Sequence, residues 1–364
     1  MKIVYMNDVV YQYAIGDPAA KGGAERYGWY LMRALAHTGW SVTVGVRFAL
    51  RKEELQVVDG VRFLGLGRGN HFLLDWYALL RRERPDWCFF QCADHHWGPA
   101  AEIARRLGVR TAFSVMHDLD VQVQRALRVR TKLWPLYLWG LKRSNIIFIQ
   151  HYGQRECLPE SLQQKTFLLP GIVSLPERVL PHQERKGTVV WAAVIRPPKR
   201  PDLLVEIASR LPTIQFVVCG APAYSHWETK TIEGIMTRLR SLPNVDYRGH
   251  VDPVQTLQAI GSASVLLSTS DGEGFPSVFL EAWAAGTPVM SMQIDPDHKI
   301  RDYRLGQAVG TVEGAVDAIR HLMGSPKCRE EMGVRSRRHV EEMHSPGTAV
   351  RAFEAAIARD SVAT

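Results

Sequence analysis

The sequence has no apolar segment long enough to cross a membrane. Its longest strongly apolar run covers about nine residues, 133–141, whereas a membrane-spanning helix needs roughly 20. The opening residues, MKIVYMND, show no basic segment followed by an apolar stretch and a small-residue cleavage site, so we expect no signal peptide. The five cysteines are odd in number and scattered. They argue against a disulfide framework and favour a reducing, cytoplasmic location.

Length and charge predict two domains and an asymmetric surface. The chain has 364 residues, of which 46% are hydrophobic and 23% charged, which suits two globular cores. Residues 1–170 hold 23 Lys+Arg against 15 Asp+Glu, and the rest hold 22 of each, so the whole net charge of +8 lies in the first half. That half either meets an acidic partner or an anionic surface, or simply carries a solvated basic face.

Strand and helix patterns alternate along the first half of the chain. Strand 2–7 (KIVYMN), a loop, helix 24–38 and strand 41–46 form a β-loop-α-β unit. The alternation continues with strands 61–66, 87–91, 111–115 and 145–150 and helices 73–82, 99–107 and 135–142. It predicts a parallel sheet with helices on both faces.

A proline-rich and charged segment interrupts this alternation, which then restarts. The second half reads as strands 188–194, 215–219 and 263–268, helices 202–210 and 231–239, and three helical segments at 312–323, 327–343 and 347–359. We therefore expect an N-terminal domain over 1–170, a linker over 171–187 and a C-terminal domain over 188–346, with helix 347–360 completing the first domain. Two such domains would form a cleft between the carboxyl ends of their strands, where ligands bind.

The stretch DGEGFPSVFLEAWAAGTPV, residues 271–289, carries two glutamates in unlike settings. Glu273 lies between glycines on a loop after a strand, where backbone can approach a ligand closely. Glu281 follows eight positions later, in helix 277–285, on the same face as Ser277. The helix N-terminus between them suits an anion. This arrangement fits a sugar nucleotide, since one carboxylate can accept hexose hydroxyls and the other a ribose diol.

This stretch resembles the E-x7-E motif of family 4 retaining glycosyltransferases, which have the α/β GT-B fold of two Rossmann-like, doubly wound parallel-sheet domains facing across a cleft. KGGAER at 21–26, KRPDLL at 199–204 and YRGHV at 247–251 agree with that family in order. The resemblance implies that Glu273 contacts the donor sugar and Glu281 the nucleotide ribose. The donor-binding residues are expected to be Gly22, Gly23, His117, Arg200, Gly249, His250, Val251, Gly274, Phe275, Pro276, Ser277 and Glu281.

Positive charge follows the first strand of the second half. Arg196 and Lys199 come after strand 188–194 and before a helix that opens with Pro201 and Asp202. Cations placed there can neutralise charge on a departing diphosphate without a metal. We expect Arg196, Lys199 and Glu273 to be catalytic. The resemblance implies an arginine and a lysine on the diphosphate, usually farther apart, so either Lys199 or Arg200 fits; counting back from the helix favours Lys199.

Three motif-like segments do not carry function in this interpretation. Residues 65–69 read G-x-G-x-G after a strand, but a dinucleotide site needs G-x-G-x-x-G on the first strand. Asp118-Leu-Asp120 imitates a D-x-D metal motif that belongs to a different glycosyltransferase fold. Residues 88–96 hold two cysteines and two histidines, yet Cys88 and Cys92, four apart on a strand, would lie ~13 Å from each other. We expect no metal and no other cofactor.

We therefore expect a retaining, metal-independent glycosyltransferase that uses a nucleotide-diphosphate sugar and binds no nucleic acid. Its acceptor would be a glycan, a lipid-linked molecule or a small molecule, and its role cell-surface polysaccharide or glycoconjugate synthesis. Two alternatives stay open: a sugar-nucleotide epimerase on the same fold, and a non-catalytic sugar-nucleotide-binding protein.

Segment 125–143, RALRVRTKLWPLYLWGLKR, interleaves basic and aromatic residues. The residues concerned are Arg125, Arg128, Arg130, Lys132, Lys142 and Arg143 around Trp134, Tyr137 and Trp139. This composition suits binding to the surface of an anionic membrane. We expect that surface to be the inner face of the membrane. Alternatively, the segment is a core helix whose buried stripe consists of Leu133, Leu136, Leu138 and Leu141.

Overall fold

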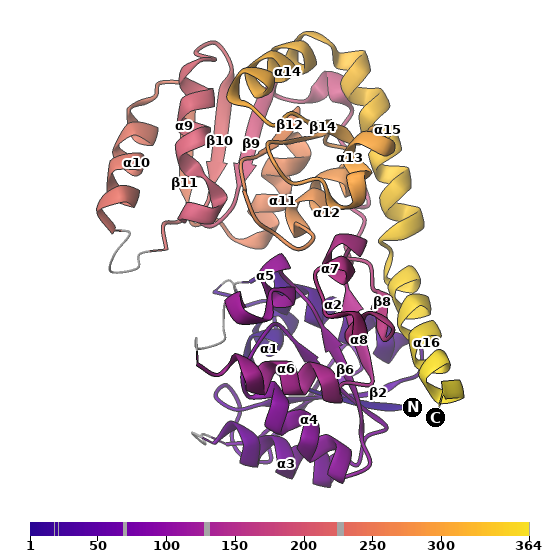
Figure 1. Cartoon of the computed structure of the whole chain (residues 1–364). Coiled ribbons are helices and arrows are strands. Elements are labelled where there is room, and N and C mark those ends of the chain that lie inside the picture. Colours follow the sequence, from indigo (N-terminus) through magenta and orange to yellow (C-terminus); the bar gives the residue numbers. More distant parts are fainter. Residues whose placement is uncertain (18, 21, 68–70, 127–131, 224–228, 364) are drawn as a thin grey trace. The chain divides into compact units, whose positions relative to one another are not determined.

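The computed structural model describes residues 1–17, 19–20, 22–67, 71–126, 132–223 and 229–363 (Figure 1). The chain divides into two compact units. The first contains Met1–Ile172 together with Pro346–Thr364, and the second contains Val173–Ser345. Each unit has its own sheet and its own core. None of the helices in the described ranges combines the length and apolarity that crossing a membrane requires.

The first unit is built on an eight-stranded sheet in the order β3-β4-β2-β1-β5-β6-β7-β8. Its strands are β1 (Lys2–Met6), β2 (Ser41–Val46), β3 (Leu55–Val58), β4 (Val61–Gly65), β5 (Trp87–Gln91), β6 (Arg110–Ser114), β7 (Ile146–Ile149) and β8 (Thr166–Leu168). All neighbours pair in parallel except β3 and β4, which pair antiparallel. The expectation of a wholly parallel sheet is therefore wrong at this edge. Asp59 and Gly60 both have positive φ, as a two-residue hairpin turn requires.

Nine α-helices of the first unit lie in the described ranges: α1 (Asp8–Ala14), α2 (Gly23–His37), α3 (Phe72–Glu83), α4 (Trp97–Arg106), α5 (Asp118–Val121), α6 (Trp134–Arg143), α7 (Tyr152–Glu156), α8 (Glu160–Gln163) and α16 (Pro346–Ala363). Helix α1 replaces part of the loop expected before α2. Its N-terminus is capped by Asn7, whose side-chain oxygen accepts from the N–H groups of Val9 and Val10.

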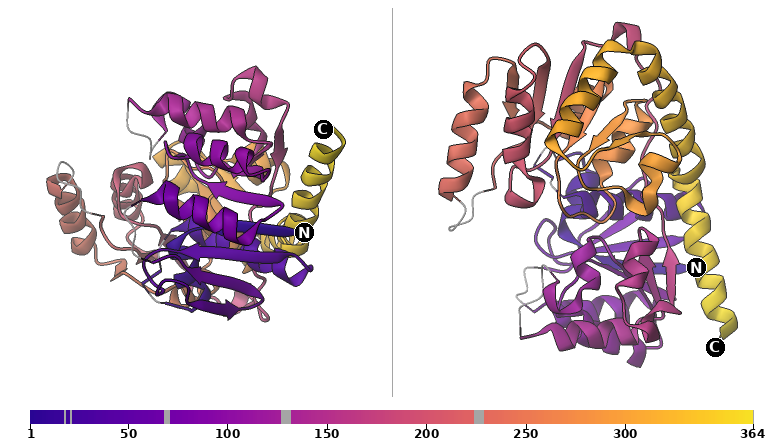
Figure 2. Two further views of the ribbon diagram at one scale, coloured as in Figure 1. Left: turned by 90° about the horizontal axis from the view of Figure 1, so that it is seen from below. Right: turned by 45° about the horizontal axis from the view of Figure 1, so that its top comes forward.

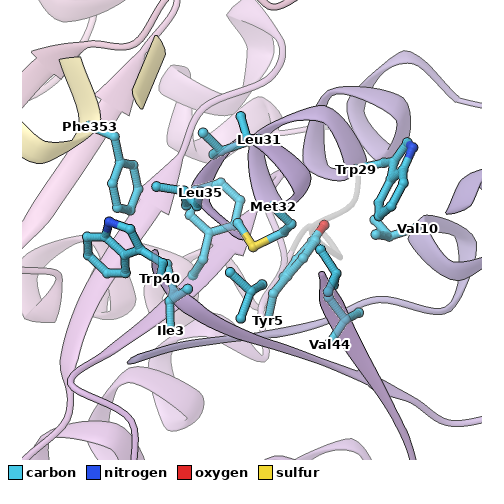
Figure 3. Close-up of a cluster of buried hydrophobic side chains, with 14 of the residues drawn as sticks. Ile3, Tyr5, Val10, Trp29, Leu31, Met32, Leu35, Trp40, Val44 and Phe353 are labelled. Atoms are coloured by element: carbon cyan, nitrogen blue, oxygen red, sulfur yellow. The ribbon is translucent and has the colours of Figure 1, made fainter. Parts of the chain in front are cut away.

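The last helix, α16, packs into the core of the first unit. Phe353 meets Trp40 edge-on at 5.7 Å between ring centroids (Figure 3). It also stacks on Phe148, with 5.1 Å between the ring centroids. The Trp40 indole N–H donates to Glu354 at 3.0 Å. In both panels of Figure 2 this yellow helix runs beside the N-terminus. The chain thus returns to its first unit after completing the second.

Helices α4 and α6 cross so closely that two glycines are required. A Cβ on Gly98 would lie 2.2 Å from the Leu136 carbonyl oxygen, and one on Gly140 would lie 2.4 Å from the Trp97 ring. The buried residues of α6 are Tyr137, Gly140 and Leu141. Of the four leucines expected to form the buried stripe, Leu141 is buried and Leu138 packs half-buried against the core. Leu133 and Leu136 are only half-buried.

Replacing Gly98 with alanine should lower the free energy of unfolding by about 1–3 kcal/mol, because the new methyl group meets backbone that cannot move aside. Gly234 is the matched control. A Cβ there meets nothing within 4 Å, so Gly234→Ala should raise stability by up to about 1 kcal/mol. Urea denaturation midpoints measure both changes. Equal stability of Gly98→Ala and the parent protein would contradict the close crossing.

The second unit has a six-stranded, wholly parallel sheet in the order β11-β10-β9-β12-β13-β14. Its strands are β9 (Thr188–Ala192), β10 (Gln215–Cys219), β11 (Val245–Gly249), β12 (Val265–Ser268), β13 (Val289–Ser291) and β14 (Gly306–Ala308). Its α-helices are α9 (Pro201–Ser209), α10 (Thr229–Ser241), α11 (Pro253–Ser262), α12 (Ser277–Ala284), α13 (Lys299–Asp302), α14 (Val312–Gly324) and α15 (Pro326–Met343). Apolar clusters on the two faces of the sheet form the core.

The later part of the expected linker is anchored firmly to this unit. Arg185 is only 7% exposed, and its guanidinium faces the second unit's core. It donates to the carbonyls of Leu180, Ala263 and Ala285 and to the Thr287 hydroxyl, at 2.7–3.1 Å. Burial lowers its pKa to about 10. The segment before β9 is thus part of the second unit's packing, because its arginine binds the carbonyl oxygens at the ends of α11 and α12.

Candidate active site

The candidate site of the second unit lies at the carboxyl ends of β9 and β12. From these two strands the chain proceeds outward in opposite directions, to β10 and β11 on one side and to β13 and β14 on the other. This is the topological switch point, where open α/β sheets bind ligands. Strand β9 leads into the basic loop through the short helix η3 (Pro197–Lys199), and β12 leads into the loop that holds Glu273.

Hydrogen bonds join these two loops. The Thr269 hydroxyl donates to the Lys199 carbonyl at 2.6 Å and accepts from the Trp191 indole N–H at 2.9 Å. The Asp271 N–H donates to the Pro198 carbonyl at 3.1 Å. Since Trp191 is itself fully buried, both loops are held against a rigid part of the core.

Lys199 and Glu273, both expected to be catalytic, are in direct contact. The Lys199 ammonium donates to the Glu273 carboxylate. The two side chains are only 16% and 15% exposed, respectively. Glu273 is therefore not a solvated loop glutamate. The pair places a cation and a carboxylate together at the switch point.

Arg200 takes a different direction from its neighbour. Its backbone is in the left-handed region, with φ of 48°, and its guanidinium binds the Asp202 carboxylate at 2.7–3.1 Å. Arg196 is exposed at the start of the loop. The structure thus brings Lys199, and not Arg200, to Glu273.

Helix α12 begins immediately after the Glu273 loop. Ser277 is its first residue, and Glu281, one turn further on, is only 7% exposed. A carboxylate so deeply placed is not a solvated helix glutamate. Gly274, Phe275 and Pro276, also expected to bind donor, are buried. The Phe275 side chain packs on Trp283 and His344, with the Lys299 ammonium over its ring at 5.2 Å, so the ring anchors the loop and only its backbone is available to a ligand.

The segment Gly249-His250-Val251 ends β11, at the same edge of the sheet. Strand β10 separates it from β9 and the basic loop. Gly249 has a φ of 66° and its carbonyl accepts from the Gly220 N–H at 2.7 Å. His250 is exposed and Val251 is half-buried. The structure therefore places these residues beside the site and not within the Lys199–Glu273 pair.

Three expected donor-binding residues belong to the first unit. Gly22 caps α2 with a φ of 109°, which favours glycine, and Gly23 is exposed as the first residue of that helix. His117 caps α5, where its Nδ1 accepts from the Leu119 N–H at 3.0 Å. The neutral imidazole must then carry its proton on Nε2. Lys21, from the same motif as the glycines, lies outside the described residues.

Asp118 and Asp120, which resemble a metal motif in the sequence, have structural roles. Asp120 is buried and accepts from the N–H groups of Met116 and His117, whereas Asp118 binds His151 at 2.7 Å and Gln154 at 3.0 Å. The two aspartates therefore do not share a ligand. In the 65–69 segment the structure describes residues only up to Gly67; Gly69 lies outside the described residues.

The contact between Asp118, His151 and Gln154 was not found by sequence reasoning. These residues follow β6 and β7, neighbouring strands of the first sheet. The only feature of the sequence that points to this contact is that polar residues follow each of two buried strands. Since Asp118 and His151 are 33 positions apart in the sequence, local spacing gives no indication of their pairing.

The whole chain has the GT-B fold. It superposes on sucrose-phosphate synthase from Thermosynechococcus elongatus with a TM-score of 0.77, at 18% identity and with 100% of both chains covered. HepE from Anabaena, in a structure described as a complex with UDP-glucose, gives a TM-score of 0.70 at 12% identity, covering 98% of this chain and 99% of that one. At such identities the likeness concerns the fold alone.

Sequence comparison gives a more specific result for the second unit. Residues 177–339 match the family described as Glycosyl transferases group 1. Over 139 residues the chain is 30% identical to a D-inositol 3-phosphate glycosyltransferase from Mycobacteroides abscessus, a match that covers 37% of this chain and 31% of that protein. The chain thus aligns with about a third of the length of this curated relative.

Proposed function

We propose that this protein is a retaining glycosyltransferase that moves a sugar from a nucleotide-diphosphate sugar to an acceptor. The observation that carries the proposal is the Lys199–Glu273 pair at the switch point of the second sheet, followed by α12 with its buried Glu281. The match of residues 177–339 to a glycosyltransferase family supports it. So does the GT-B fold of the whole chain.

Each residue has a defined part in this proposal. Lys199 and Arg196 neutralise the charge that gathers on the departing diphosphate, and the N–H groups at the start of α12 assist them. Glu273 accepts hydroxyl groups of the donor sugar, and Glu281 holds the ribose. The resemblance to family 4 implies front-face transfer, in which the departing phosphate helps to deprotonate the acceptor. Such a site needs no metal.

The partners proposed are a nucleotide-sugar donor and a glycan, lipid-linked or small-molecule acceptor. The similar protein HepE is described in complexes with UDP and with UDP-glucose, which favours a nucleoside-diphosphate donor here. We propose that the protein works in the cytoplasm and takes part in the synthesis of polysaccharides or glycoconjugates of the cell surface.

A panel of UDP, GDP and ADP sugars in thermal-shift measurements tests the proposal. A ligand at about 100 times its Kd adds about 2.7 kcal/mol of stability, so a true donor gives a clear shift. The protein is then incubated with that donor and no acceptor. Slow release of free nucleotide supports transfer, whereas interconversion of sugars would indicate an epimerase. No shift with any sugar nucleotide would contradict the proposal.

Glu281→Gln and Glu281→Ala should each weaken binding of the free nucleotide diphosphate by about 1.5–3 kcal/mol, as expected for a lost hydrogen bond to a charged group. Isothermal titration calorimetry measures the change. Glu233→Ala, at an exposed position of α10, is the control and should bind normally. A folded Glu281→Gln variant with unchanged affinity would remove the ribose role.

Membrane contact through 125–143 also stays a prediction. Arg128 and Arg130 lie outside the described residues. Arg125, Lys132 and Lys142 are exposed, whereas Tyr137 is buried and Arg143 binds Glu102 at 3.4 Å. The basic side chains, more than the aromatic ones, are therefore available to lipid headgroups.

Replacing Arg125, Lys132 and Lys142 with glutamine should reduce cosedimentation with anionic liposomes at low salt, since each charge near the surface contributes about 1 kcal/mol. Replacing Arg238 and Arg240, exposed on α10, is the matched control and should change nothing. If the parent protein does not pellet at low salt, or if the triple variant pellets equally, a soluble acceptor is favoured.

A further inference from the structure

A group of side chains that the proposed transfer does not use lies directly after β5. Asp94, His95 and His96 form the turn between β5 and α4, and one ligand atom from each lies within 4.8 Å of the others. In the first sheet the chain proceeds outward from β1 in one direction and from β5 in the other. The turn therefore lies at the switch point of the first unit, where ligands of open α/β sheets bind.

Local hydrogen bonds shape the turn so that both imidazoles meet the carboxylate. The Asp94 Oδ1 accepts from the His96 backbone N–H at 2.7 Å and also lies 2.7 Å from the His96 Nδ1 and 3.6 Å from the His95 Nδ1. The two imidazole rings lie 4.2 Å apart, and Phe72 packs against His96 at 5.2 Å. These contacts fix the ring positions.

The geometry points to a binding site for one divalent transition-metal ion, and we propose Zn²⁺ as the ion that fits best. Imidazole nitrogen and carboxylate oxygen are ligands that zinc accepts, at ~2.0–2.2 Å. In a tetrahedral site of that size the ligand atoms lie ~3.4 Å apart. The 3.6 Å between Asp94 and His95 already meets this distance. The 2.7 Å between Asp94 and His96 would open by several tenths of an ångström as the ion replaces a shared proton.

Three protein ligands leave a fourth position open, as in zinc sites that bind small molecules. The side chains of Asp94, His95 and His96 are 33%, 18% and 40% exposed, so water, phosphate or another oxygen ligand can reach the ion. The cysteines of this segment are not needed. Cys88 is fully buried inside β5, where burial raises the pKa of its thiol above the ordinary value, and zinc binds the thiolate.

Zinc titration of the full chain tests this site without reference to catalysis. The protein is treated with EDTA, desalted, and titrated with ZnCl₂ by calorimetry at pH 7.5 and at pH 5.5. We expect one saturable ion per chain at pH 7.5 and weaker binding at pH 5.5, because the imidazoles must be neutral to bind metal. Titration with CoCl₂ should give visible absorption bands that report low-symmetry nitrogen and oxygen coordination.

His95→Gln, His96→Gln and Asp94→Asn should each weaken zinc binding by more than about tenfold. His321→Gln, at an exposed position of α14, is the matched control and should bind as the parent does. Circular dichroism checks that each variant is folded. If a histidine variant does not fold, Asp94→Asn, which keeps the size of the side chain, still tests whether the site binds zinc. The proposal fails if the parent binds no zinc saturably, or if the three variants keep its affinity and Co²⁺ spectrum.

Discussion

Replacing Lys199 with alanine is expected to reduce turnover by about 10²–10³-fold, the cost of one group that stabilises transition-state charge. Lys199 is the basic side chain of this loop that contacts Glu273. On the proposed function its ammonium neutralises charge on a diphosphate bound at α12. Arg196→Ala is expected to lose activity on the same scale. Release of nucleotide from the donor measures both effects.

Arg200→Ala is the control within the same loop. Its guanidinium already binds Asp202, so its removal should change turnover much less than removal of Lys199. A loss in Arg200→Ala as large as in Lys199→Ala would assign the diphosphate to Arg200. EDTA should leave nucleotide release unchanged, and abolition by EDTA with rescue by manganese would contradict cationic side chains as the source of the stabilisation.

A second effect of Lys199→Ala must be separated from the first. Removing the ammonium leaves the Glu273 carboxylate, only 15% exposed, without that contact, and this can displace the loop. Stability and binding of the free nucleotide diphosphate separate the two effects. If Lys199 acts on the diphosphate, a Lys199→Ala variant as stable as the parent protein binds the nucleotide diphosphate more weakly. Lost activity with unchanged nucleotide-diphosphate affinity and a lowered urea midpoint would show that the loss came from the unpaired Glu273 carboxylate.

The strands and helices of both units could be predicted largely because their apolar residues follow regular spacing. The bounds predicted for β5 and β10 agree with the structure residue by residue. Strand β3 is not predicted from the sequence, although Asp59-Gly60 is a hairpin signal, because its side chains alternate only between half-buried and exposed. Strands β13 and β14, of three residues each, are too short to show any periodicity.

In the candidate site, too, the features set by nearby residues could be predicted, whereas those set by contacts distant in the sequence could not. Glu273 and Lys199 could be placed at neighbouring strand ends because each follows a recognisable strand. The sequence could not predict that the Arg200 side chain turns away from Glu273, because this direction depends on a left-handed backbone conformation that non-glycine residues adopt uncommonly. The prolines and charged residues around Arg185 predict a linker. The partners of this arginine are carbonyl oxygens as distant as Ala263 and Ala285, and no side-chain pattern encodes them.

The second unit is expected to lose several kcal/mol of stability between about pH 6.5 and pH 4. Two buried histidines are the cause. His182 and His339 are 6% and 5% exposed, and burial, aided by nearby positive charge, lowers the pKa of each to about 4. For His182 that charge comes from Arg185 and Arg329; for His339 it comes from Lys299, opposed by Glu342.

The direction of this pH dependence follows from the protonation of the two histidines in the folded and the unfolded state. Well above pH 6.5 both histidines are neutral whether the chain is folded or not, so they add no pH dependence there. Between pH 6.5 and pH 4 the two histidines are protonated in the unfolded chain but stay neutral in the folded unit. The free energy of unfolding therefore falls by as much as ~1.4 kcal/mol per pH unit for each histidine. Below pH 4 their contribution is constant. Carboxylates change protonation mainly at the lower end of this window, so its upper part reports the histidines.

His339→Phe should flatten this pH dependence while keeping the packing. The His339 ring lies 4.7 Å from the Tyr303 ring and 5.8 Å from the Trp283 ring, so phenylalanine preserves the aromatic contacts and removes one titrating group. Thermal midpoints recorded from pH 7.5 to pH 4.5 measure the slope. His321→Gln, exposed on α14, should keep the slope of the parent protein. A His339→Phe slope equal to the parent's would show that this buried imidazole does not resist protonation in the folded unit.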